Sequence, residues 1–248
     1  MSPFRQRERL TELKSESANV RLKNQKKQKA IRSCDAKTSL ALVLISDTHE
    51  FHREITVPRA DLLLCSGDFT MFSRSLRAIV DFNEWLGELP HRYRVIVPGN
   101  HETFLQTNAS NRSLLSNAVV LINEGVEIEG LRIWGTPVTA GFGPAFGIRS
   151  AEQRRRLYAK IPNGTDILIT HGPPYGILDC SLGSSVHQGD PVLFEAVKRV
   201  RPKLHLFGHI HGAHGIYETE NTTFLNAALL GPDGDIAKEP VVLRMTRQ

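Results

Sequence analysis

The sequence predicts an α/β protein with a mixed sheet, in which a crossover unit precedes antiparallel strands. Continuous apolar runs at 40–45 and 61–66 are typical of strands that are covered on both faces. Apolar residues at 73–87 then recur at helical spacing, and a third apolar run follows at 94–97. A strand, a helix and a strand in this order predict a right-handed crossover unit.

Later segments predict a hairpin, two capped helices and further strands. Apolar and polar residues alternate on both sides of Glu129–Gly130, which is typical of a hairpin with one buried face. Ser150 and Gln153 fit a capping box, and we interpret the Arg154–Arg156 run as the solvated face of that helix. Asp190–Pro191 has the cap and first-turn residues of another helix. Strands are expected at 166–169, 204–207, 215–218, 222–226 and 241–245, the last three of them antiparallel.

Charge is distributed unevenly along the 248 residues, whose net charge is +5. Residues 1–37 hold 11 of the 31 Lys/Arg and 4 of the 26 Asp/Glu, which leaves 20 basic and 22 acidic residues for the rest. The first stretch therefore predicts a basic, disordered or weakly helical tail, and 38–248 predicts one domain. A nucleic-acid or membrane-surface anchor is the alternative role for the tail.

Composition excludes several classes of protein. The longest apolar run, 40–45, is too short to span a bilayer, and the N-terminal stretch lacks the apolar core of a secretory signal. The three cysteines, Cys34, Cys65 and Cys180, are widely spaced and fit neither a disulfide framework nor a thiolate zinc site. We expect a cytoplasmic protein with reduced thiols.

Five apolar runs end in residues that can bind metal ions. These ends are Ser46–His49, Ser66–Asp68, Gly99–Glu102, Thr170–Pro173 and Gly208–His211. Open α/β sheets bind ligands at the carboxyl ends of their strands, so we expect the five ends to converge. Residues two apart in an extended chain point the same way, so Asp47 and His49 can bind one ion together, and His209 and His211, with the same spacing, can reach the same site from another strand. Asp68 is predicted to bridge two ions.

The expected donors are two carboxylates, one carboxamide and four imidazoles. They belong to Asp47, Asp68, Asn100, His49, His171, His209 and His211. This set suits Mn, Fe, Zn, Co or Ni better than Ca or Mg. Two divalent ions, two carboxylates and one bridging hydroxide leave about one positive charge, which a phosphodiester monoanion would neutralise. His101 is the candidate proton donor to the leaving oxygen, and Glu102 could orient it.

These motifs resemble those of the calcineurin-like metallophosphoesterase superfamily, whose series is D-x-H, G-D, G-N-H, G-H or T-H, and G-H-x-H. Here they are Asp47-Thr48-His49, Gly67-Asp68, Gly99-Asn100-His101, Thr170-His171 and Gly208-His209-Ile210-His211. Segments 82–90, 170–179 and 201–209 resemble one branch more closely, the small metallophosphoesterase-domain-containing proteins. The resemblance covers about residues 40–245.

The resemblance implies a four-layer αββα sandwich with two metal ions. It assigns the first ion to Asp47, His49, Asp68 and His211, and the second to Asp68, Asn100, His171 and His209. Some relatives in this branch lose the first His of G-H-x-H and catalyse poorly, so His209 favours activity. The sequence departs from the family pattern at Phe146–Gly147, where an aromatic residue and Asn are expected.

The predicted function is a dinuclear metal-dependent phosphodiesterase, with Mn as the first choice of metal and a metal-bridging hydroxide as nucleophile. Small phosphodiesters, cyclic nucleotides among them, are the expected substrates. A phosphomonoesterase or protein phosphatase is the alternative, and a nucleic-acid-associated or scaffold protein acting through the tail is another. His52 and His187 are candidate substrate contacts, whereas His91, His205 and His214 are expected to be structural or solvent-exposed.

Overall fold

The computed structural model describes residues 39–246, except 74, 142 and 232–233. Residues Leu40–Gln248 form one compact unit. The tail predicted at 1–37 lies outside the described residues. In the part of the chain that the structure describes, no helix is long and apolar enough to cross a membrane.

The first sheet has five strands in the order β11-β1-β2-β3-β4. Neighbours from β1 to β4 are parallel, with Leu42 opposite Leu62 and Leu62 opposite Tyr93. Of the three C-terminal strands expected to be antiparallel, β11 lies beside β1 in this sheet and not with the other two. Alternation along a short strand defines its buried face but not its partner. The strands are β1 (Ser39–Ile45), β2 (Leu62–Cys65), β3 (Tyr93–Ile96), β4 (Val119–Val120) and β11 (Val241–Thr246).

The second sheet has six strands in the order β5-β6-β7-β8-β10-β9. Its four central strands are parallel, and the two edge strands, β5 and β9, are antiparallel to their neighbours. The predicted hairpin is β5–β6, and its turn residues Glu129 and Gly130 both have positive φ, 52° and 80°. The strands are β5 (Glu124–Ile128), β6 (Leu131–Thr136), β7 (Ile167–Thr170), β8 (Leu204–Phe207), β9 (Gly215–Glu218) and β10 (Thr223–Asn226).

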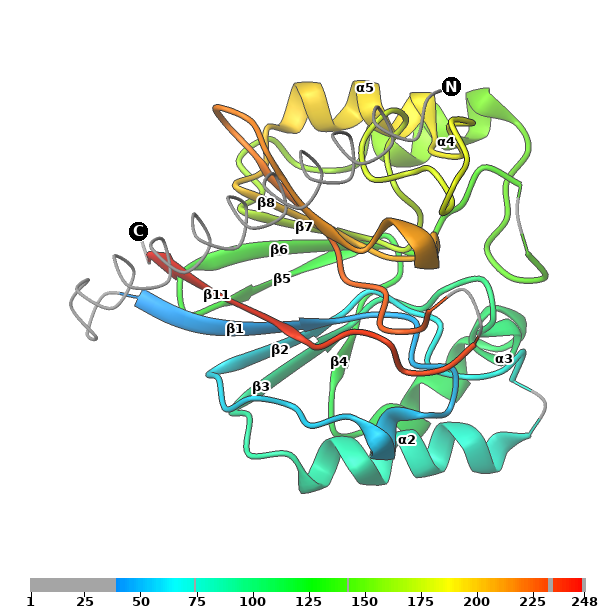
Figure 1. Ribbon diagram of the computed structural model, residues 1–248, viewed down its shortest axis with the longest axis vertical. Coiled ribbons are helices and arrows are strands. Elements are labelled where there is room, and N and C mark those ends of the chain that lie inside the picture. The colour runs from blue at the N-terminus through cyan, green and yellow to red at the C-terminus, as the bar shows by residue number, and fades with distance from the viewer. Residues whose placement is uncertain (1–38, 74, 142, 232–233, 247–248) are drawn as a thin grey trace, which may run out of the picture. The chain divides into compact units, whose positions relative to one another are not determined.

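Helices cover the outer face of each sheet (Figure 1). Buried side chains form three clusters, which correspond to the three interfaces between four layers. Successive β1 residues alternate between interfaces, so that Leu44 faces the other sheet and Ile45 faces α2. The expected αββα sandwich is therefore confirmed. The helices are α2 (Leu76–Glu88), α3 (Thr103–Thr107), α4 (Ala151–Tyr158) and α5 (Pro191–Val200), with 3-10 turns η1 (His52–Glu54), η2 (Ala109–Leu115) and η3 (His211–Ala213).

Asp190 links the two helices of the second sheet. It caps α5 as expected, because its Oδ1 accepts from Val192 N at 2.8 Å. It also accepts from Arg154 Nε on α4 at 2.8 Å, and both of these side chains are buried. The interpretation of Arg154 as part of a solvated face is therefore wrong. Arg154 points inward because it pairs with the buried carboxylate of Asp190, whereas Arg155 and Arg156 are exposed.

The segment after β10 joins the two sheets. Ser46, which follows β1, and Ala228 form an isolated parallel bridge, and Leu229 N donates to Ser46 O at 2.9 Å. The fully buried Asn226 donates through Nδ2 to Ile210 O at 3.1 Å and accepts through Oδ1 from Ala228 N at 3.1 Å. The strand-end loops of both sheets are thus held together by main-chain bonds.

Candidate metal centre

Four of the residues that carry the motifs sit on tightly bent backbone rather than on extended strand. Asp47, His49, Asp68 and His209 have φ of 53°, 41°, 50° and 69°, in the left-handed region that non-glycine residues rarely occupy. Asp47 N donates to Gly67 O at 2.9 Å, and His49 N donates to Asp68 O at 3.0 Å. The premise that Asp47 and His49 converge through extended-chain alternation is wrong. Loop-to-loop hydrogen bonds hold them instead, and such strain is typical of functional sites.

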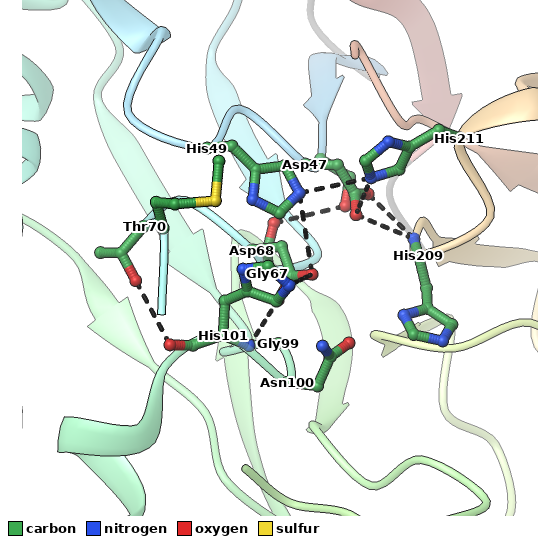
Figure 2. A network of polar contacts seen from close by, with 12 residues as sticks. Asp47, His49, Gly67, Asp68, Thr70, Gly99, Asn100, His101, His209 and His211 are labelled. Carbon is green, nitrogen blue, oxygen red and sulfur yellow. Dashed lines mark hydrogen bonds and ion pairs between the residues drawn. The ribbon is translucent and has the colours of Figure 1, made fainter. Parts of the chain in front are cut away.

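One group of donors comprises Asp47, His49 and His211. Their ligand atoms lie within 4.8 Å of one another. His211 Nε2 is 3.4 Å from Asp47 Oδ1 and 3.3 Å from His49 Nε2 (Figure 2). Asp47 also accepts from the main-chain N–H of His209, with its Oδ2 at 2.9 Å. The main chain at His209 therefore fixes the carboxylate of Asp47, which faces the imidazoles of His49 and His211.

The second group comprises Asp68, His171 and His209, whose ligand atoms also lie within 4.8 Å of one another. His171 Nε2 is 3.2 Å from Asp68 Oδ2 and 2.8 Å from Asn100 Oδ1. His171 Nδ1 lies 2.9 Å from the carbonyl of Ser66, to which it donates, so in the neutral ring the lone pair is on Nε2. His209 and His211 thus fall into different groups, in the same division as the assignment that the resemblance implies, and their roles as ligands stay a prediction.

Asp68 lies between the two groups. Its Oδ2 is 3.2 Å from His171 Nε2 and 3.9 Å from His49 Nε2, although the two histidines belong to different groups. The other oxygen, Oδ1, accepts from His101 N at 2.9 Å, which orients the carboxylate. The position of Asp68 fits the predicted bridging role, which stays a prediction.

Two glycines of the motifs make room for the carboxylates. A Cβ at Gly99 would lie 2.2 Å from Asp68 Oδ1, and one at Gly208 would lie 2.0 Å from Asp47 Oδ2. No side chain fits at these distances, so glycine is required next to each donor for a steric reason. Gly143 has the same relationship to Asn100, because its Cβ would lie 2.5 Å from the carboxamide nitrogen. The Gly/Phe-rich loop around Phe146 therefore borders the site.

Charges within the cluster shift the pKa values of its members. Burial alone would raise the pKa of Asp47, but contact with His211 and the charge of His171 hold it well below its usual range. Burial opposes protonation of His171 as well, but Asp68 raises the pKa of His171 to about 9. Burial and the charge of His171 lower the pKa of His209 to about 4. The carboxylates of Asp68 and Asp47 therefore favour a positive charge at His171.

His101 lies at the edge of this cluster. Its Nε2 is 3.8 Å from Asp68 Oδ2, and its ring is 4.5 Å from that of His49. The ring of Phe72 stacks on it at 3.9 Å between centroids, tilted by 18°. Burial lowers the pKa of His101, with the charge of Asp68 opposing this shift.

The expectation that Glu102 orients His101 is wrong. Glu102 is fully buried and accepts from the main-chain N–H of Asp68 at 2.9 Å and of Gly99 at 2.6 Å. Its other oxygen accepts from Thr70 N and Oγ1 at 3.0 and 2.9 Å. Glu102 thus ties together the loops that carry Asp68 and Asn100. Glu102 could be singled out from the sequence because it follows the motif residue His101, but the direction of its side chain could not be predicted.

The two histidines predicted to contact substrate lie in different surroundings. His52 is buried, bonded to Asp81 at 2.9 Å and packed against Phe82 and Trp85, all on α2. These contacts give no support to a role in substrate binding, which stays a prediction. His187 is partly exposed, and its Nδ1 donates to Asp179 Oδ1 at 2.7 Å.

The histidines expected to be structural have internal partners. His205 is buried and bonded to Thr170 Oγ1 at 2.9 Å. His91 is bonded to Pro58 O at 3.0 Å, and His214 to Ala228 O at 2.9 Å.

The donors present fit two transition-metal ions. Neutral imidazole and carboxylate suit Mn, Fe, Co, Ni or Zn. His49 Nε2 faces His211 Nε2 at 3.3 Å, an arrangement that a shared cation would satisfy for both nitrogens. The seven predicted ligands come from loops after β1, β2, β3, β7 and β8, and the structure brings them to one place. Their roles as ligands stay a prediction.

The profile of calcineurin-like phosphoesterases matches residues 40–213, which contain all five strand-end motifs. The match covers more than half of the sequence, and the chain belongs to this family. The resemblance stated from the motifs is therefore confirmed.

Individual relatives agree with this assignment. The chain is 35% identical to metallophosphoesterase domain-containing protein 1 of Homo sapiens, over 81% of this chain and 69% of that protein. It is 34% identical to UPF0046 protein K07C11.7 of Caenorhabditis elegans, over 86% and 78% of the two chains. Among solved structures, TT1561 of Thermus thermophilus is similar in fold, with a TM-score of 0.52, 15% identity and coverage of 76% and 89%.

Proposed function

We propose that the protein is a dinuclear metal-dependent phosphodiesterase in which Asp68 is the ligand common to both ions. The observation that carries this proposal is the position of Asp68 Oδ2, between His171 of one donor group and His49 of the other. Asp47, His49 and His211 would complete one ion's shell, and Asn100, His171 and His209 the other's. When bound, the two ions would supply water of lowered pKa and polarise the phosphoryl oxygens.

The chain's own residues do the rest. Ser66 O accepts from Nδ1–H of His171, which fixes the orientation of the ring and directs Nε2 toward Asp68 and Asn100. His101 is placed to donate a proton to the leaving oxygen, because its Nε2 lies 3.8 Å from Asp68 Oδ2 at the edge of the cluster. Glu102 holds the loops that carry Asp68 and Asn100 together, because it accepts from the main-chain N–H groups of Asp68 and Gly99.

A diester substrate and Mn are supported by charge and donor type. Two divalent ions and two carboxylates, with one hydroxide, leave about one positive charge, which matches a diester monoanion better than a monoester dianion. A donor set of imidazole, carboxylate and carboxamide without thiolate suits Mn. Small diesters, including cyclic nucleotides, are the substrates to examine first.

The test is hydrolysis of a bis-aryl phosphodiester by chelator-treated protein to which Mn²⁺, Zn²⁺ or Mg²⁺ is returned. We expect activity with Mn²⁺ and a loss on the order of 10²-fold or more for Asp68→Asn and His209→Ala. Glu195→Gln, an exposed carboxylate on α5, is the control and should keep the full rate. Undiminished hydrolysis by Asp68→Asn would refute the proposed centre. Faster hydrolysis of aryl monoesters in a parallel assay with 2′,3′- and 3′,5′-cyclic nucleotides would refute the diester preference alone.

A further inference from the structure

A second cluster of metal-binding side chains lies outside the residues assigned to the dinuclear centre. Asp179, Cys180 and His187 offer ligand atoms that all lie within 4.8 Å of one another. Cys180 and His187 are paired across a loop as an isolated antiparallel bridge, which brings residues seven apart in sequence together. The sequence argued against a thiolate metal site because no cysteine has a CxxC partner. The structure supplies an aspartate and a histidine as partners instead.

We propose that Asp179, Cys180 and His187 bind one soft divalent cation, such as Zn²⁺, with water as the fourth ligand. In a tetrahedral zinc site the ligand atoms are roughly 3.3–3.6 Å apart. Cys180 Sγ lies 3.4 Å from His187 Nδ1 and 3.8 Å from Asp179 Oδ1, close to these values. The Asp179 Oδ1–His187 Nδ1 distance of 2.7 Å is that of a hydrogen bond, and it would have to open by roughly 0.6 Å. The partly exposed ring of His187 has room to make this change.

Asp179 is held in place before any cation arrives. Its side chain is 1% exposed, and its Oδ2 accepts from Gly176 N at 2.9 Å and from Gly189 N at 3.0 Å. Oδ1 is thereby left to face the imidazole and the thiol. Carboxylates that bind metal ions are usually held in this way, by hydrogen bonds to the oxygen that does not face the ion.

The proton and charge balance of binding is simple. The Cys180 thiol loses its proton to solvent, and neutral His187 keeps one proton, which moves from Nδ1 to Nε2 by exchange with water. The dication then balances one thiolate and one carboxylate. Desolvation and the charge of Asp179 raise the pKa of the Cys180 thiol, and a cation on Asp179 would offset that charge.

A cation bound by Asp179, Cys180 and His187 would hold together the two ends of a loop that lies next to the dinuclear centre. A Cβ at Gly212, the residue after His211, would lie 2.5 Å from Leu182 N, so the loop between Cys180 and His187 packs directly on the turn that carries His211. Leu182 and Val186 in this loop are largely exposed, and the cation would tie down its two ends. The proposed role is structural, and it does not depend on which ester is hydrolysed.

The test uses Co²⁺, because a thiolate bound to Co²⁺ gives a near-ultraviolet charge-transfer band, whereas imidazole and carboxylate do not. The donors assigned to the dinuclear centre contain no thiolate, so the band reports only the second cluster. The protein used for this test should carry Cys34→Ser, since Cys34 lies outside the described residues, and Cys65 stays because its side chain is fully buried. We expect a saturable band that added Zn²⁺ abolishes.

Variants assign the band to its ligands. Cys180→Ser should eliminate it, and His187→Gln should weaken Co²⁺ binding at this site by about 10-fold or more. Ser185→Ala in the same loop and His209→Ala in the dinuclear centre should leave the band in place. Absence of a band in the Cys34→Ser protein, or its persistence in Cys180→Ser, would overturn the proposal. Unchanged Co²⁺ affinity in His187→Gln would remove His187 from the site and overturn the three-ligand assignment.

Discussion

The ring of Phe72 lies nearly parallel to the imidazole of His101, with 3.9 Å between centroids and 18° between planes. Phe72 has a φ of 61°, and Ser73 behind it donates from Oγ to His101 O at 3.0 Å. A strained loop therefore holds an aromatic ring against the candidate proton donor. We expect this contact to position His101.

Replacing Phe72 with Ala should lower kcat for the aryl diester by about 10-fold with little change in KM, because the imidazole loses its neighbour but the metal ligands do not. Phe72→Tyr, which keeps the stacked ring, should retain most of the rate. Steady-state kinetics of the two variants decides this. A change in KM alone would instead place Phe72 in substrate binding.

Metal titration of variants should distinguish the ligand that both ions share from the ligands that bind only one ion. His209→Ala and His211→Ala should each weaken one of the two binding steps, because they belong to different donor groups. Asp68→Asn should weaken both steps, since Asp68 lies between the groups. Isothermal titration of metal-free protein with Mn²⁺ measures the two steps, and two normal steps in Asp68→Asn would contradict the bridging role.

Glu102→Gln should destabilise the protein even in the absence of metal. The amide nitrogen would replace an oxygen that accepts two bonds, so at least one buried donor would face another donor. The expected loss is about 1–3 kcal/mol in the free energy of unfolding, measured with urea. Glu88→Gln, at an exposed ion pair with Arg53, should change it by less than about 1 kcal/mol.

Two adjacent arginines should differ sharply when each is changed to Ala. Arg154→Ala leaves the buried Asp190 without its ion-pair partner and should lower the free energy of unfolding by about 3–5 kcal/mol. Arg155 is exposed and pairs only at the surface with Glu152, so Arg155→Ala should cost less than about 1 kcal/mol. Equal effects in thermal or urea unfolding would contradict the buried ion pair.

Asp166 should make stability depend on pH at acidic values. Burial opposes its ionisation, but bonds from Arg132 N at 3.0 Å and Lys203 Nζ at 3.0 Å lower its pKa in the folded state. A lowered pKa means that the stabilisation is complete above the unfolded-state pKa of about 4 and disappears as the pH falls through the folded-state value. Asp166→Asn should therefore lose about 1–2 kcal/mol at pH 7 and approach the parent protein near pH 3. A constant difference across that range would contradict this account.

The strand-end motifs could be predicted from the sequence because they combine buried apolar runs with residues that have no packing role at a strand end. Their local geometry could not, since Asp47 and His49 reach the site through left-handed backbone that no side-chain pattern encodes. The place of β11 and the inward turn of Arg154 depend on long-range partners, β1 and Asp190. The direction of Glu102 depends on which main-chain donors lie free around it, and only the assembled loops determine that.

The bridge between Ser46 and Ala228 has a consequence for how specificity can change in this fold. Asp47, Asp68 and Asn100 follow strands of the first sheet, whereas His171, His209 and His211 follow strands of the second. Since main-chain pairing joins the sheets at this end, the backbone sets the distance between the donors that follow the strands of one sheet and those that follow the strands of the other. The two sheets are joined at this end and do not meet at a hinge. New substrates would therefore be accommodated by changes in the loops around the joint, while the residues that bind metal stay the same.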